Sequence, residues 1–358
     1  MNQINDTNKK IIPLSFNLSL ISEYRTEIMG FAALCIILCH ANVAGVVTPA
    51  PLQYLLGLGN VGVDIFLFVS GLGMYYSLTK RGIINPYSRT VNIWYDVRCW
   101  YVDHYKRIMI PYLIVTIPWW VYYAISRQIG FGGFLLNLST IGYWFLHYGA
   151  WYVALLVPVY LLTPPLALLI ERISKSRKNY RLLIVALLCF LTWIISSLKF
   201  DVQSDYGQAF VNNVQMAFCR VPIYIMGYGV APLVKKNCSI SWLWLILCPI
   251  IMIAMNLIPF VCHWYRAWLL ALPFIMIVCF LLVQNRSLKR VLHFMGVISL
   301  ESYLANVFVT YALEEFDFQS LGVLSNGNYL FYSLVILFGM TIAILANKFS
   351  NKIILDKR

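Results

Sequence analysis

The chain has 358 residues, of which 61% are hydrophobic and only 11% are charged, and its mean hydropathy is +0.74. A soluble domain of this length carries about twice that charged fraction, and the polar side chains here are too few to cover a water-soluble globule. The composition therefore excludes a soluble protein and predicts an integral membrane protein in contact with lipid. The net charge of +13 does not indicate nucleic acid as a partner, because membrane proteins gather basic residues in their cytoplasmic loops.

Ten apolar segments are long enough, or nearly so, to cross a bilayer as helices. In chain order they are 28–46, 60–78, 108–126, 149–170, 182–198, 208–231, 241–260, 265–284, 292–313 and 328–347. Open sheets cannot exist in lipid, and these runs are unlike the short alternating strands of a barrel. The sequence thus predicts an all-α bundle of about ten transmembrane helices. The segment 131–148 is apolar but broken by glycines, and we expect it to be interfacial or re-entrant.

Charges in the connecting loops predict the orientation of the bundle. Basic residues occupy every second loop, at 80–107, 172–181, 235–236, 286–290 and 348–358. Opposite loops such as 201–205 and 314–317 are mixed or acidic. Both termini are therefore expected in the cytoplasm, with 1–24 as a cytoplasmic segment that lacks a cleavable signal. No internal repeat or linker is evident, so 1–358 is expected to form one domain.

Metal ligation and serine or cysteine nucleophiles are not indicated. Most of the nine cysteines sit in apolar runs without metal or disulfide spacing, as expected of small buried residues. Ser70, in FVSGLG, lacks the strand–turn–helix setting of a nucleophile elbow. We therefore expect no metal cofactor.

Four ionisable residues fall inside or at the edge of predicted spans: His40, Asp64, Arg220 and Glu301. A charge facing hydrocarbon is costly, so each is expected to face a cavity or a partner. His40 and Asp64 lie at similar depth, toward the outer ends of the first two spans. A histidine beside a carboxylate is a workable general base. Alternatively, His40 is a packing residue and Asp64 a charge at a helix start.

Arg220 lies mid-span beside Pro222, and a proline break often opens a cavity. Arg220 is expected either to contact substrate or to form an ion pair with Glu301 or Asp64. Glu301 itself is expected to be a structural partner rather than a catalyst, with Asn306 as a hydrogen-bonding neighbour.

Aromatic and basic residues near the span ends have two interpretations each. Trp144 and Trp151, near the outer mouth, are either interfacial anchors or stacking platforms for a sugar ring. Lys106 and Arg107 either determine topology or bind the phosphates of a coenzyme.

Several motifs, in order, resemble the membrane-bound acyltransferase family 3, which is typified by bacterial O-acetyltransferases of lipopolysaccharide, capsule and peptidoglycan. YRTEIMGFAALCIILCHAN, at 24–42, resembles its first span, and GNVGVDIFLFVSGLGMY, at 59–75, resembles its GVDIFF-type motif followed by SG. Four later stretches resemble further elements: HYKRIMIPYL (104–113), WYVALLVPVYLLTPPL (151–166), RVPIYIMGYG (220–229) and SLESYLANVF (299–308).

The resemblance implies an O-acyltransferase of the inner membrane of a bacterium. Its expected donor is cytoplasmic acyl-CoA, acetyl-CoA first and succinyl-CoA second. Its expected acceptor is a hydroxyl of a cell-envelope glycan, an exopolysaccharide or a lipid-linked sugar. By this resemblance, His40 matches the essential histidine of the first span and Asp64 matches the aspartate of the second motif.

One position departs from the family pattern. Many members have an arginine eleven residues before that histidine, where this chain has Met29. Arg25, one helical turn earlier, either takes over a coenzyme-binding or charge-pairing role or belongs to a subgroup with altered donor handling. The resulting hypothesis has Arg25, Lys106 and Arg107 meeting the coenzyme phosphates. His40 then takes a proton from the acceptor hydroxyl, and Arg220 stabilises an oxyanion or holds the cavity together.

Two other functions stay open on sequence alone. A transporter or flippase of a lipid-linked sugar would also explain the bundle, the buried charges and the outer aromatics. A homologue without catalytic activity, acting as a binding or assembly subunit, would explain Met29. The sequence is compatible with a homo-oligomer but does not predict one.

Overall fold

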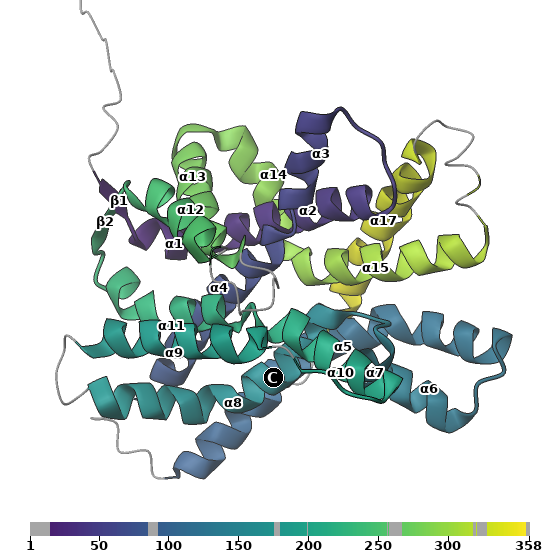
Figure 1. Cartoon of the computed structure of the whole chain (residues 1–358), viewed down its shortest axis with the longest axis horizontal. Helices are drawn as coiled ribbons and strands as arrows, with labels where there is room; N and C mark the ends of the chain where they lie inside the picture. Colours follow the sequence, from purple (N-terminus) through teal and green to yellow (C-terminus); the bar gives the residue numbers. More distant parts are fainter. Residues whose placement is uncertain are drawn as a thin grey trace, which may run out of the picture.

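The fold is a bundle of helices with one small pair of strands (Figure 1). The computed structural model describes residues 15–84, 92–174, 180–198, 200–255, 257, 267–317, 320 and 328–355. Within them, eight candidate spans are long and apolar enough to cross a bilayer: Arg25–Val43, Ala50–Lys80, Ile93–Ser126, Trp151–Ser174, Tyr180–Ser197, Asp205–Lys235, Ala267–Gln284 and Tyr329–Ile354. A ninth is the pair Arg286–Val297 and Ser299–Glu315, bent by 67°. The expected all-α membrane bundle is confirmed, at eight to nine spans in the described residues.

The difference from ten spans concerns the predicted segments 241–260 and 292–313. The first contains α12 (Trp244–Met255), which at twelve residues is too short to cross a bilayer. Positions 256 and 258–266 lie outside the described residues. The second predicted segment is the bent pair.

The glycine-broken segment between the third and fourth spans forms no span, as expected. It consists of the short helices α6 (Phe131–Leu138) and α7 (Ile141–Leu146). Whether it lies on the outer side stays a prediction.

The longer helices have these labels and bounds: α2 (Arg25–Val43), α4 (Val61–Lys80), α5 (Ile93–Ser126), α8 (Trp151–Ser174), α9 (Tyr180–Ser197), α11 (Val221–Lys235), α13 (Ala271–Gln284), α14 (Arg286–Val297), α15 (Ser299–Glu315) and α17 (Tyr329–Leu355). The shorter ones are α1 (Ser19–Glu23), α3 (Ala50–Leu58), α10 (Asp205–Phe218) and the 3-10 turn η1 (Ala267–Leu270). In Figure 1, α8, α9 and α11 run side by side at the lower left. Helix α4 joins this group to the other half of the bundle, because it packs on α11 and on α2.

Helix α5 begins well before the span predicted at 108–126. It starts at Ile93, where the side chain of Asn92 caps the helix by accepting a hydrogen bond from the Tyr95 N–H at 3.1 Å. Lys106 and Arg107, expected in a loop, therefore lie on a helix. Hydropathy identified only the second half of α5 because the first half carries charges.

The strands fasten the described part of the N-terminal segment to the bundle. β1 (Ser15–Asn17) pairs antiparallel with β2 (Ser239–Ser241), which follows α11. The segment therefore lies on the same side of the bundle as the basic loop 235–236. Which side faces the cytoplasm stays a prediction, and residues 1–14, 85–91, 175–179 and 356–358 of the expected cytoplasmic segments lie outside the described residues.

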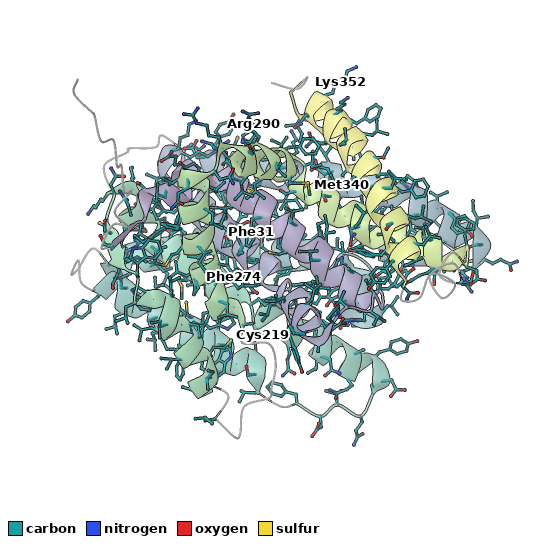
Figure 2. All side chains as sticks on the ribbon, turned by 90° about the horizontal axis from the view of Figure 1, so that it is seen from above. Phe31, Cys219, Phe274, Arg290, Met340 and Lys352 are labelled. Carbon is teal, nitrogen blue, oxygen red and sulfur yellow. The ribbon has the colours of Figure 1, made fainter. Side chains whose placement is uncertain are left out.

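The half of the bundle that contains α2 is packed through aromatic rings as well as through backbone. The rings of Phe31 on α2 and Phe274 on α13 stack at a centroid distance of 6.2 Å, and Figure 2 labels both near the middle of the view. Arg290 of α14 and Lys352 of α17 project from the upper edge of the same view. The aromatic contact fixes α13 against the helix that carries His40.

Two glycines let α4 and α11 approach backbone to backbone. A Cβ atom at Gly71 would fall on the carbonyl of Tyr224, and one at Gly227 would fall on the carbonyl of Phe68. In lipid, helices associate largely through such close packing of small residues. These two positions therefore set the distance between the two helices.

Replacing Gly227 by alanine is expected to destabilise the protein by about 1–3 kcal/mol, the usual cost of overpacking a close contact. Gly132→Ala is the matched control, because a Cβ at that exposed position on α6 has no atom within 4 Å. Melting of the two variants in detergent, followed by fluorescence-detected size exclusion, checks this. Equal melting temperatures would contradict it.

Candidate functional site

A cavity of about 420 Å³ lies where five helices converge. Its walls come from α2, α4, α5, α8 and α15. The lining changes character along its length, from basic side chains such as Lys80 to tyrosines such as Tyr152. Such a concave site between helices of a bundle is where a ligand is expected to bind.

Three exposed cations form one end of this cavity, which we call the basic mouth: Arg25, Lys80 and Arg107. The guanidinium of Arg25 lies over Gly73, where a Cβ atom would come within 2.6 Å of it, so the glycine leaves room for the arginine. Met29, at the departure from the family pattern, lines the same cavity one turn along α2. Arg25 is thus a cation in the cavity that Met29 also faces.

A second cavity of about 280 Å³ adjoins the basic mouth. Lys80, His104 and Arg107 line both cavities, and the ion pair between Arg81 and Asp103 lines the second. Lys106 is exposed and lines neither of these two cavities. Phosphate groups fit this end well, because arginine and lysine bind them by charge-assisted hydrogen bonds.

His104 is buried at the mouth by stacking on a neighbouring ring. Its imidazole lies 4.2 Å from the Trp100 ring, nearly parallel to it. Its Nδ1–H donates to the carbonyl of Trp100 at 2.7 Å, which leaves Nε2 as the hydrogen-bond acceptor. His104 therefore lines the cavity, at the end away from His40.

Tyrosine hydroxyls hold α5 against α8 and so position the mouth. Tyr101 donates to the carbonyl of Leu161 at 2.7 Å, and Tyr105 donates to the carbonyl of Val157 at 2.8 Å. Pro165 lacks the N–H that would otherwise bond to Leu161 within the helix. A freed carbonyl in lipid needs such a donor, and the side chain of α5 supplies it.

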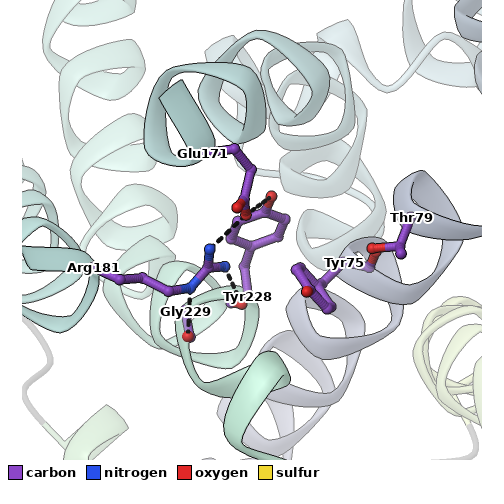
Figure 3. Close-up of polar contacts among 6 residues, drawn as sticks. All are labelled: Tyr75, Thr79, Glu171, Arg181, Tyr228 and Gly229. Carbon is purple, nitrogen blue, oxygen red and sulfur yellow. Dashed lines mark hydrogen bonds and ion pairs between the residues drawn. The ribbon is translucent and has the colours of Figure 1, made fainter. Parts of the chain in front are cut away.

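A polar cluster joins α8, α9, α11 and α4 near the same end (Figure 3). Arg181 forms an ion pair with Glu171 at 2.5 Å and donates to the carbonyl of Gly229 at 3.2 Å. Tyr228 donates to Glu171 at 3.1 Å, and the guanidinium of Arg181 lies 5.3 Å from the ring centre of Tyr75. Arg181, expected in a basic loop, instead lies at the start of α9 and contacts α4 through the Tyr75 ring.

Tyr152 and Tyr303 lie at the other end of the cavity, next to His40. The backbone N–H of Tyr152 donates to the hydroxyl of Tyr303 at 3.3 Å, and the two rings meet edge to face. The His40 ring lies 6.5 Å from the Tyr303 ring but does not line the cavity itself. From Arg25 to His40 the distance along α2 is about 22 Å, at 1.5 Å per residue.

A directional chain of hydrogen bonds holds the His40 ring. Tyr332 donates its single hydroxyl proton to the carbonyl of Ile37, so it accepts from the Asn306 Nδ2–H at 3.2 Å. The amide oxygen of Asn306 therefore faces His40 and accepts from its Nδ1–H. Nε2 is left with a free lone pair, which is the form that acts as a base.

Asp64 and Arg220 form a buried ion pair. Arg220 Nη1 lies 3.3 Å from Asp64 Oδ2 and donates to the Asn60 carbonyl at 3.2 Å. The side chains are only 0% and 4% exposed, respectively. The guanidinium also lies 5.0 Å from the centre of the Trp151 ring. Of the two pairings open for Arg220, the structure thus gives the one with Asp64.

The structure does not join His40 and Asp64 by a direct contact. Among the described contacts, the ring nitrogen of His40 meets Asn306, and Asp64 meets Arg220. The ring is therefore oriented by an amide where the sequence suggested a carboxylate. Asp64 instead forms an ion pair with Arg220.

Glu301 bonds to α17 and not to Asn306. It accepts hydrogen bonds from Asn347 at 3.1 Å and from Ser350 at 3.2 Å. The expected contact with Asn306 is wrong, because Asn306 lies more than a turn further along α15 and points at His40. The buried Glu301 therefore holds α15 against α17 through these two hydrogen bonds.

Sequence reasoning missed Lys80, His104, Tyr303 and Tyr332 as members of the site. In the sequence, Lys80 belongs to a basic loop and His104 begins the motif HYKRIMIPYL, and neither feature indicates a cavity. Nothing in the sequence separates the two tyrosines from the other 22 in the chain. Within the described residues, no group of three histidines, cysteines or carboxylates is placed to hold a metal ion.

The comparisons with known proteins give one match. The profile of an acyltransferase domain, that of acyltransferase family 3, matches residues 30–348. No curated protein and no solved structure matches the chain. The matched range contains every residue of the site described above except Arg25 and Met29.

Proposed function

The chain belongs to acyltransferase family 3 and is therefore a membrane-bound acyltransferase. We propose that it is an O-acyltransferase and that the group it transfers is an acetyl group in the first place. The donor is cytoplasmic acetyl-CoA, or succinyl-CoA as the second candidate. The acceptor is a hydroxyl of a cell-envelope glycan, an exopolysaccharide or a lipid-linked sugar, at the inner membrane of a bacterium. The observation that carries this proposal is the cavity that runs from three cations to the tyrosines beside His40.

The donor enters at the basic mouth. Arg25, Lys80 and Arg107 neutralise the coenzyme phosphates, and the adjoining cavity beside His104 has room for more of the nucleotide. The thioester arm then extends along the cavity toward Tyr303. The exposed cations at one end and the mostly apolar walls beyond them match a ligand with a charged head and a slender arm.

The chemical step uses the free lone pair of His40. Nε2 takes the proton of the acceptor hydroxyl as its oxygen attacks the thioester carbonyl. The carbon–sulfur bond breaks, and the departing thiolate receives the proton, so that free coenzyme thiol and an ester are formed. A covalent acyl-histidine would use the same nitrogen as nucleophile, and trapping of acylated protein distinguishes the two routes.

Arg220 and Asp64 act together in this proposal. The guanidinium, fixed by Asp64, stabilises charge that develops on the carbonyl oxygen or holds the site together. Trp151, over which the guanidinium lies, is a surface on which an acceptor sugar ring can stack.

Release of free thiol from acetyl-CoA by the purified protein in detergent tests the proposal without knowledge of the acceptor. Acetyl-CoA-dependent release, with succinyl-CoA measured in parallel, supports an acyltransferase. A transporter or flippase would move a lipid-linked sugar without consuming acyl-CoA. Absence of both release and coenzyme binding would favour the transporter or the inactive homologue.

Charge reversal at the mouth is expected to weaken donor binding. Arg107→Glu should raise the KM for acetyl-CoA about 10- to 100-fold with little change in kcat, because a charge-assisted hydrogen bond contributes about 1.5–3 kcal/mol. Lys106→Glu is the matched control, since that neighbour lines neither cavity and should leave KM nearly unchanged. A KM for Arg107→Glu equal to that of the wild type would contradict the binding site, and a similar rise in both variants would add Lys106 to it.

A further inference from the structure

Tyr303 stands between the donor cavity and His40. Its side chain, buried and only 2% exposed, lines the cavity, and its ring lies 6.5 Å from the ring of His40. His40 is half-buried, so part of its surface is accessible, yet it does not line the donor cavity. Tyr303 therefore contacts both the cavity and His40, although His40 is not part of the cavity wall.

We propose that Tyr303 is a partition that keeps the donor thioester apart from His40 until an acceptor occupies the site. The inference rests on the proposed function. It assigns Tyr303 a role in specificity: it makes the acceptor hydroxyl, and not water, the group that receives the acyl chain.

The contacts of Tyr303 suit a side chain that can be displaced. Among the described residues, its hydroxyl has one hydrogen bond, from the Tyr152 backbone N–H at 3.3 Å. Its ring meets Tyr152 edge to face at 5.7 Å. The chain that orients His40 runs separately through Asn306 and Tyr332. The ring of Tyr303 can therefore move without releasing the base.

Removing the partition exposes the thioester to an activated water. His40 Nε2 takes a proton from water as the water oxygen attacks the thioester carbonyl, and the carbon–sulfur bond breaks. The thiolate then receives the proton from the imidazolium. The products are free acetate and free coenzyme thiol, with no other reactant consumed.

The test compares thiol and acetate release from acetyl-CoA in the absence of any acceptor. Tyr303→Ala is expected to hydrolyse acetyl-CoA about tenfold faster than the wild type, which corresponds to about 1.4 kcal/mol in the barrier. Adding His40→Ala to Tyr303→Ala should remove the increase. Tyr54→Ala, at an exposed tyrosine of α3, is the matched control and should hydrolyse at the wild-type rate.

Folding and function are separated by two further measurements. If Tyr303→Ala does not give a monodisperse protein in detergent, Tyr303→Leu keeps an apolar side chain for packing but removes the ring, and it should still leak faster than the wild type. Thiol release by the wild type at the same rate as by a folded Tyr303 variant would overturn the partition alone. Absence of release from the wild type and from both folded Tyr303 variants, with either acyl-CoA, would overturn the proposed function and the partition with it.

Discussion

His40→Ala is expected to lower acyl transfer by about 10²- to 10⁴-fold, the usual contribution of a positioned general base. The physical reason is the hydrogen-bond chain through Asn306, which leaves the Nε2 lone pair of His40 free to accept a proton. Thiol release from acetyl-CoA by purified protein, normalised to the amount of folded protein, measures the effect. The protein level should not change, because His40 is only half-buried.

Two other histidines, His104 and His293, serve as controls for this prediction. His104→Ala should raise the KM for acetyl-CoA while preserving turnover, because His104 lines the mouth and not the inner end. His293→Ala should behave as the wild type, since among the described residues this exposed side chain meets Glu27, near the start of α2, and lines neither cavity. Full activity of His40→Ala, or loss of turnover in His104→Ala, would transfer the role of base to His104.

Arg220→Ala is expected to cause the largest loss of stability of any single substitution considered, about 3–5 kcal/mol. The substitution leaves the carboxylate of Asp64, which is fully buried, without the guanidinium 3.3 Å away. The melting temperature in detergent should fall sharply, and the yield of folded protein should fall with it. A variant that melts with the wild type would show that the ion pair does not stabilise the bundle.

A double variant with apolar residues of similar size, Asp64→Leu with Arg220→Met, separates folding from chemistry. Replacing both partners of a buried pair is often neutral or stabilising, so folding should largely recover. Thiol release by this folded double variant then reports on the site itself. Recovered release would mean that the pair only holds the helices together, and absent release would support a role for Arg220 at the carbonyl oxygen.

The sequence located the buried charges but not their partners. Apolar runs made His40, Asp64, Arg220 and Glu301 conspicuous, because a charge inside such a run needs an explanation. Which side chain meets which depends on how each helix is rotated about its axis and where it crosses its neighbour. For this reason the amide of Asn306 contacts His40, which is far away in the sequence. Its nearness in sequence to Glu301 suggested a hydrogen bond with that residue, but Glu301 bonds to α17.

Hydropathy likewise predicted some parts of the helices and missed others. It found the apolar spans because their length is set by the thickness of the bilayer. It missed the first half of α5, where charges alternate with aromatics and a capping asparagine sets the start. That half supplies His104 and Arg107 to the cavity, so the part of the helix that hydropathy cannot detect is the part that lines the basic mouth.

The pairing of β1 with β2 has a consequence for the order of assembly during synthesis. Ser15 pairs with Ser241, so the strand just before Arg25 has no partner until two thirds of the chain has been made. The hydrogen bonds that orient His40 form later still, because Asn306 and Tyr332 come later in the chain. Contacts of such high sequence separation form slowly. Helix α2 is therefore the first to be inserted but among the last to complete its contacts. A nascent chain that is released early carries His40 without Asn306 and Tyr332, which orient it.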